Sequence, residues 1–209
     1  MRHRPIRVAL AAALPLALVL SCGKKEKVGE GRELSKNPVT ALGQLTDAAQ
    51  KAAETAKEME EMKPVDPVSF NALLPLLPEA PAGFTAAGDP RGETTQAMGV
   101  KVSEVERRYT KGDQHLHVKF VDGAYNPLIY AGITMASQFA RESTEGFEKG
   151  VTIDGNPGIE KWNKASKRGE LDVVVGKRFV VSIEASPVES GFVRSIYNSL
   201  DRARLAALK

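Results

Sequence analysis

Alternating apolar and polar residues predict a β-hairpin near the middle of the chain. Residues 104–109 and 115–120 alternate with the period at which side chains of a strand share one face, and only Arg107 interrupts the apolar side. Gly112-Asp113 lies between them and suits a two-residue turn. The resulting register sets apolar residues opposite each other and opposite charges opposite each other: Tyr109 with Leu116, and Glu106 with Lys119.

Further along, a second pair of strands has the clearest period-2 pattern in the chain. Apolar residues alternate over 171–175 and again over 179–183, on either side of Gly176. Both apolar sets can share a face only across a loop of odd length or a bulge, with Gly176 as the accommodating residue. Two more strands are predicted over 146–154 and 159–166, separated by a Gly- and Pro-containing turn.

Two helices are predicted around these strands. Asn126-Pro127 is a typical helix start, and the apolar residues of 128–140 follow at helical spacing on so wide a face that we expect this helix to be well covered. Ser186-Pro187-Val188-Glu189 has the form of a capping box and predicts the start of a C-terminal helix. The Pro-rich stretch 74–81 contains leucines that we expect to lie over the core.

The order of these elements predicts an α+β domain over residues 64–209. Hairpin connections favour a mainly antiparallel sheet, and two apolar-faced helices would cover it. The order loosely resembles that of PsbP-like domains, which implies a role in assisting or assembling a larger complex. The resemblance includes no shared functional motif, so no residue is assigned a role from it.

A heptad pattern precedes this domain. Asn37-Pro38 predicts a helix start and Lys63-Pro64 its end. Between them the spacing alternates between three and four residues, as on an a/d stripe: Leu42, Leu45, Ala49, Ala52, Ala56 and Met59. The helix over 37–63 would either associate with a partner or with itself, or else pack on its own domain or serve as a solvated spacer. Its many alanines favour the second alternative, because they bury little area.

The first residues have the pattern of a secretory signal. Three arginines precede an apolar run over 8–20, which is too short to span a bilayer comfortably. Val19-Leu20-Ser21-Cys22 resembles the lipobox of bacterial lipoproteins. The resemblance implies a signal peptide over 1–21, cleavage before Cys22, and acylation of its thiol and amine, which anchors the chain in a membrane. Ordinary secretion and an uncut anchor are the alternatives.

The sequence that follows Cys22 reads as a tether. Residues 22–36 are charged and have few apolar side chains, so they cannot form a core. Gly23, with no aspartate beside the cysteine, resembles the sorting signal of outer-membrane lipoproteins, which implies a bacterial envelope protein that faces the periplasm from the outer membrane.

Composition changes this picture in two ways. The chain of 209 residues has 29 Lys+Arg and 26 Asp+Glu, a net charge of +3. That excess equals Arg2, Arg4 and Arg7 of the signal peptide, so the remaining chain is balanced and nucleic-acid binding is not expected. A single cysteine excludes an internal disulfide and a zinc site of several thiolates.

Candidate chemistry is sparse. His115 and His117 share one face of a predicted strand and would ligate a metal if carboxylates such as Glu104, Glu106 or Asp122 converged on them. Their position on the polar side of the strand favours simple exposure. No nucleophile motif or phosphate loop is present, so we expect no cofactor and do not expect an enzyme.

A basic cluster is the remaining candidate for a surface contact. It lies around a predicted turn and consists of Lys161, Trp162, Lys164, Lys167 and Arg168. It would face an anionic surface, or else form a solvated rim of the sheet. The leading hypothesis is therefore a membrane-anchored lipoprotein with a non-catalytic binding or scaffolding domain. A domain that binds a lipid or small apolar ligand between sheet and helix comes second, and a metal-dependent enzyme using His115 and His117 third.

Overall fold

One antiparallel sheet organises the part of the chain that the structure describes. The computed structural model describes residues 50, 53–54, 56–58, 60–97 and 99–209, so the predicted signal peptide, Cys22, the tether and the start of the heptad helix lie outside it. The sheet has 9 strands: β1 (Thr85–Ala86), β2 (Arg91–Ala97), β3 (Val100–Lys111), β4 (Gln114–Asp122), β5 (Ala140–Ser143), β6 (Gly146–Ile153), β7 (Asn156–Asn163), β8 (Arg168–Val175) and β9 (Phe179–Ser186).

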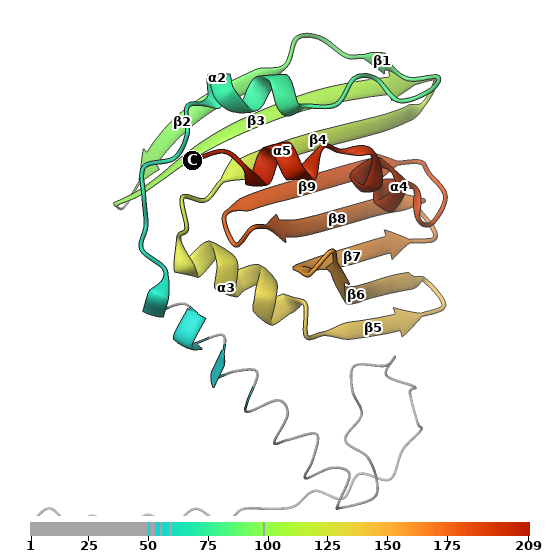
Figure 1. The fold of residues 1–209 in the computed structure, drawn as a ribbon. Coiled ribbons are helices and arrows are strands. Elements are labelled where there is room, and N and C mark those ends of the chain that lie inside the picture. The colour runs from blue at the N-terminus through green and yellow to red at the C-terminus, as the bar shows by residue number, and fades with distance from the viewer. Residues whose placement is uncertain (1–49, 51–52, 55, 59, 98) are drawn as a thin grey trace, which may run out of the picture.

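All neighbouring strands run antiparallel. The order across the sheet is β1-β3-β4-β9-β8-β7-β6-β5, and β2 pairs with the same strand as β1, further along β3. Figure 1 shows the sheet with short helices against it. The helices are α2 (Phe70–Leu73), the 3-10 turn η1 (Leu74–Leu76), α3 (Pro127–Ala136), α4 (Phe192–Ser199) and α5 (Arg202–Ala206). The predicted α+β class with a mainly antiparallel sheet is confirmed.

Both predicted hairpins are present, and the first has the expected register. In β3–β4, Tyr109 pairs with Leu116 and Glu106 with Lys119, across the two-residue Gly112-Asp113 turn. In β8–β9, Val175 pairs with Phe179, so the loop has the odd length that the pattern requires. Its first residue, Gly176, has a φ of 60°, in the left-handed region that glycine tolerates best.

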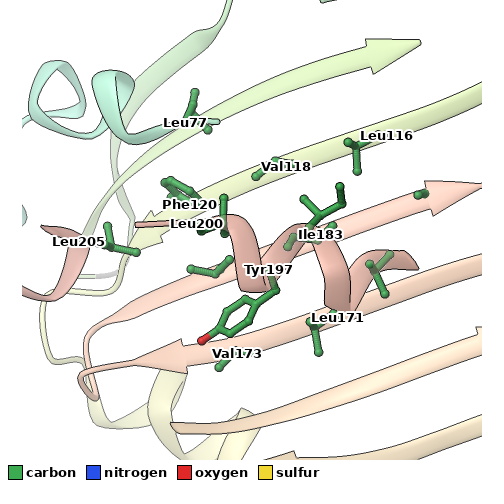
Figure 2. Close-up of a cluster of buried hydrophobic side chains, with 14 of the residues drawn as sticks. Leu77, Leu116, Val118, Phe120, Leu171, Val173, Ile183, Tyr197, Leu200 and Leu205 are labelled. Atoms are coloured by element: carbon green, nitrogen blue, oxygen red, sulfur yellow. The ribbon is translucent and has the colours of Figure 1, made fainter. Parts of the chain in front are cut away.

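The core lies on one face of the sheet, which we call the core face. Strand side chains such as Val118, Leu171 and Val173 pack there against Tyr197 of α4 and Leu205 of α5 (Figure 2). The other end of this face is covered by α2, η1 and the Pro-rich stretch: Leu73 of α2 is buried, and Leu77 of the Pro-rich stretch is buried as expected. The opposite side, the outer face, has a smaller cluster in which Tyr130 of α3 packs on Val174 and Val180.

The helices differ from the prediction in number and start. The expected capping box at Ser186 is wrong: β9 continues through Ser186, and α4 begins only at Phe192, after Gly191 with a φ of 87°. Leu200, with a ψ of 145°, then interrupts the expected single helix, and Asp201 caps α5. Ser186 is held by strand pairing with His115, and a pattern of residue types does not reveal that competition.

A buried ion pair holds several segments at one corner of the sheet. Asp122, at the end of β4, is fully buried and accepts hydrogen bonds from Arg178 Nε at 2.8 Å and Nη2 at 2.7 Å. The same carboxylate accepts the backbone N–H groups of Val68 and Ala124, both at 2.8 Å. Every lone pair is thus used, which offsets the cost of removing the charge from water.

Replacement of Asp122 by alanine is expected to lower the free energy of unfolding by about 3–5 kcal/mol, because it leaves the Arg178 guanidinium buried without a partner. Urea denaturation followed by the fluorescence of Trp162 measures the change. The matched control is Asp66→Ala: Asp66 forms a 2.9 Å ion pair with Lys101 but its side chain is 84% exposed, so we expect less than about 0.5 kcal/mol. Equal effects of the two variants would contradict a structural role of the buried pair.

Candidate functional site

The surface of α3 carries the most unusual feature of the domain. Leu128 and Met135 of α3, and Phe139 just after its end, are 74%, 65% and 70% exposed, although all three are large and apolar. The prediction that this helix is well covered is therefore wrong. α3 packs with one side on β7 and β8, and a helix that is apolar all round has a further side that a single sheet cannot cover.

This exposed side of α3 also lacks charge. No Asp, Glu, Lys or Arg occurs from Gly123 to Ala140. Elsewhere on the described surface, strands carry ion pairs such as Lys119–Glu104 at 2.7 Å and Lys161–Glu148 at 3.0 Å. An uncharged surface with exposed Leu, Met and Phe side chains is typical of a contact surface, since isolated apolar residues are normal but grouped ones are not.

On its inner side α3 is closely packed. Tyr130 is buried, and Ile129 and Ile133 pack around it against Val174 and Val180 of the sheet. Beyond the end of the helix, the backbone N–H of Gly150 donates to the carbonyl of Phe139 at 2.7 Å. A Cβ at position 150 would lie 1.6 Å from the carbonyl oxygen of Ser137, so the chain following α3 lies directly on β6.

The end of the predicted heptad helix contacts this same region. The described residues between Gln50 and Glu61 are helical. Glu58 accepts hydrogen bonds from the Tyr130 hydroxyl at 2.7 Å and from Lys177 Nζ at 2.8 Å, and Met62 packs on the cluster beneath α3. The C-terminal end of this helix thus packs on its own domain, which was one of the two alternatives. Residues 37–49 lie outside the described part.

Hydrogen bonds and burial at this contact shift three pKa values. Those from Lys177 and Tyr130 lower the pKa of Glu58 below its usual 4.5. The pKa of Lys177 is raised, chiefly by its hydrogen bond to Glu58, and the pKa of Tyr130 is raised, chiefly by burial. The contact therefore favours a charged carboxylate between an ammonium group and a neutral phenol.

The two candidate metal ligands do not form a metal site. Both lie on the outer face of β4, where His115 is exposed and His117 Nε2 is 2.8 Å from Glu106 Oε2. Of the other candidate carboxylates, Glu104 pairs with Lys119. Asp122 lies on the core face, opposite to the face of the histidines, and pairs there with Arg178. Within the described part of the chain, no group of three His, Cys, Asp or Glu side chains could hold a metal ion.

The candidate basic cluster is largely neutralised. Lys161 pairs with Glu148 at 3.0 Å, Lys167 with Glu189 at 2.8 Å, and Arg168 with Glu170 and Glu184 at 2.7 and 2.9 Å. Lys164 is exposed, and Trp162 is half-buried beside Phe147, with ring centroids 6.4 Å apart. These ion pairs favour the solvated rim over a free cationic surface.

The paired charges form a continuous row across the outer face. Strand register places its members directly opposite one another, from one strand to the next: Arg141, Glu148, Lys161, Glu170, Glu184, His117 and Arg108. Glu170 and Glu184 are like charges in direct opposition, and Arg168 bridges both. Lys161 and Arg168 also line a shallow, open hollow of about 240 Å³.

No protein-family model, curated protein or solved structure matches this chain. The candidate site is therefore identified from the geometry of the described residues alone. That geometry singles out the exposed side of α3, which the sequence pattern alone assigned to the core. The signal that could have found it is the absence of charge on any side of 123–140, since a helix that packs on a sheet with one side normally shows a polar side to solvent.

The contact of Glu58 is expected to weaken in acid. A carboxylate whose pKa is lowered in the folded state contributes stability that is present above its ordinary pKa, here 4.5, and is lost as the pH falls through the folded value. NMR signals of the Tyr130 ring, followed from pH 7 to pH 3, measure this. Glu58→Gln should abolish that titration, whereas Glu54→Gln should leave it intact. A Tyr130 titration that persists in Glu58→Gln would contradict the assigned contact.

Proposed function

We propose that this chain is a lipid-anchored protein of the bacterial envelope whose globular part is a non-catalytic docking module. The observation that carries the docking role is the uncharged side of α3 with Leu128, Met135 and Phe139 exposed. Exposed apolar groups that are held in place by a rigid sheet mark a site of association, because covering them removes apolar area from water.

The proposed anchor is Cys22. Its support is the lipobox-like Val19-Leu20-Ser21-Cys22 after a short apolar run and three arginines. In the described part of the chain, no helix is long and apolar enough to cross a membrane. Acyl chains on Cys22 would supply membrane attachment, and the proposed location is the periplasmic side of the outer membrane.

The packing beneath α3 weighs against the ligand-binding alternative. Such a ligand would need space between α3 and the sheet, and that region is occupied by Tyr130, Ile129, Ile133, Val174 and Val180. Two of the carboxylates near the histidines are similarly engaged by cations: Glu106 pairs with Arg108 at 3.1 Å and Glu104 with Lys119 at 2.7 Å. A docking surface needs neither an internal cavity nor an open ligand position, so the geometry favours it over both alternatives.

Cys22→Ser is expected to release the protein from membranes, because serine cannot accept the thioether-linked lipid. Partition between detergent and aqueous phases, together with metabolic labelling by a palmitate analogue, measures the loss. Ser21→Ala is the matched control, since it keeps a small residue beside the cut, and it should stay in the membrane fraction. Unchanged membrane retention of Cys22→Ser would refute the anchor.

The exposed side chains of α3 are expected to serve association and not folding. Leu128→Ser with Phe139→Ser should change the free energy of unfolding by about 1 kcal/mol or less, because both side chains are already exposed. The buried control on the same helix, Tyr130→Ala, should cost about 3–5 kcal/mol.

In formaldehyde-treated cells, the Leu128/Phe139 double variant should lose the crosslinked species that contain the wild-type protein. A loss of stability as large as that of Tyr130→Ala would assign these residues to the core. Crosslinked species that persist in a stable double variant would place docking elsewhere.

A further inference from the structure

The exposed side of α3 has a regular spacing, which indicates what covers it. Leu128, Gly132 and Met135 follow at steps of four and three residues, so they lie along one side of α3, and the exposed Phe139 comes four residues later, after the end of the helix. We call these four residues the α3 stripe. Leu128, Met135 and Phe139 project from it, and Gly132 leaves a gap between them.

No contact in the described part of the chain requires a glycine at position 132. It is exposed in the middle of α3, and a Cβ built there would meet no atom within 4 Å other than those of its chain neighbours and of the backbone of α3 itself. Glycine in a helix interior is less stable than alanine, so the position sacrifices stability without relieving any internal crowding. A glycine at such a position suits close approach by a group from outside the protomer.

We propose that the α3 stripe is the interface of a homodimer in which the α3 helices of two copies pack antiparallel across a two-fold axis. The proposal deepens the docking role proposed above and rests on it. In this arrangement Met135 of each copy lies over Gly132 of the other, and Leu128 of each copy lies beside Phe139 of the other. Both pairs are centred on the same point, midway between Ile133 and Thr134.

The stripe matches its own reversed copy, and this is the argument for a second copy as the occupant. A two-fold interface requires a surface that complements itself, with residue i contacting j and j contacting i. Reversal of the stripe puts its large side chain at 135 opposite its gap at 132, as in knobs-into-holes packing. Because 123–140 has no charged residue, no like charges meet across the axis.

The charges near α3 argue against an anionic lipid surface as the occupant. Acids and bases on the neighbouring segment nearly balance once the partner of Glu58 is included: Glu54, Glu58, Glu60 and Glu61 against Lys57, Lys63 and Lys177. A surface that binds anionic headgroups would carry an excess of bases. An uncharged, self-complementary stripe beside a segment with no basic excess fits a second copy better than an anionic bilayer.

The small area of the α3 stripe limits the affinity of the dimer, so we expect the dimer to form where the protein is concentrated at a membrane. A stable interface buries about 800 Å² on each partner, and four positions on one short helix provide less than that. The dimer is therefore weak in dilute solution. Two copies tethered to the same membrane have a high effective concentration, and this raises dimer population without any new contact.

Cysteine crosslinking of the full-length protein in its own membranes tests the proposal. Leu128→Cys and Phe139→Cys, on two differently tagged copies, are co-expressed and oxidised with copper phenanthroline. The expected result is a mixed-tag disulfide dimer at least five times more abundant than in two controls. The first control is Leu128→Cys on both copies, whose cysteines would lie about 16 Å apart along the helices. The second pairs Leu128→Cys with Gln138→Cys, which is exposed but off the stripe.

The Gly132→Leu variant distinguishes specific close packing at position 132 from unspecific apolar association. The substitution makes the stripe more apolar and the protomer helix more favourable, so its thermal melting should not fall. We expect it to reduce the Leu128–Phe139 crosslink at least fivefold, because the gap for Met135 is filled. An unchanged or increased crosslink would show unspecific apolar association and overturn the proposal, as would equal crosslinking in the Leu128-only control.

Further outcomes distinguish this proposal from the function on which it rests. Membrane-bound protein with no mixed dimer above the controls would overturn the homodimer and leave the anchor intact. Protein found in the soluble fraction would refute the anchor, and the crosslink would then be measured at high protein concentration. A bimane probe on Phe139→Cys that shifts to shorter wavelength with vesicles of phosphatidylethanolamine and phosphatidylglycerol, without dimer formation, would assign the stripe to lipid and overturn the homodimer.

Discussion

The buried Asp122–Arg178 pair is the contact on which the arrangement of the remaining segments depends. Asp122 ends β4, and Arg178 lies in the turn between β8 and β9, so the pair joins two hairpins that are far apart in sequence. The carboxylate also binds the backbone of Val68 and Ala124. The segment that enters the domain, the turn that starts α3, and the sheet therefore meet at one buried charge pair, and loss of either partner would leave an unpaired buried charge at that point.

The sequence predicted the parts of the fold that depend on local pattern. The β3–β4 register followed from period-2 alternation and from turn length, because a strand that slips by one residue exposes its whole apolar set. For β8–β9 the alternation predicted the shared apolar face and left an odd loop or a bulge as alternatives; the loop is odd. The start of α3 at Asn126-Pro127 followed from capping, and the structure has Asn126 as the cap. The start of α4 did not, because Ser186 is held by strand pairing with His115 and is unavailable as a cap.

The candidate site could not be predicted from the pattern of apolar and polar residues alone. Periodicity identifies an apolar side of a helix but does not say how much of that side a sheet will cover. The prediction assigned Leu128, Met135 and Phe139 to a covered surface, whereas the sheet covers only the side with Tyr130 and Ala131. The ion pairs of Lys161, Lys167 and Arg168 were likewise hidden, since their partners come from neighbouring strands and from the segment after β9.

The attachment of the N-terminal segment has a mechanical consequence. The N–H of Val65 donates to the carbonyl of Ala124 at 3.1 Å, and that of Val68 donates to Asp122, so the segment is fastened at the corner where α3 begins. Any tension that reaches the domain from its N-terminal side is applied first to Glu58 and Met62, and then to these two bonds. The strands of the sheet, which are hydrogen-bonded to one another, would experience the force last. A pulling force on the N-terminal segment would therefore break the contacts at this corner before it reaches the sheet.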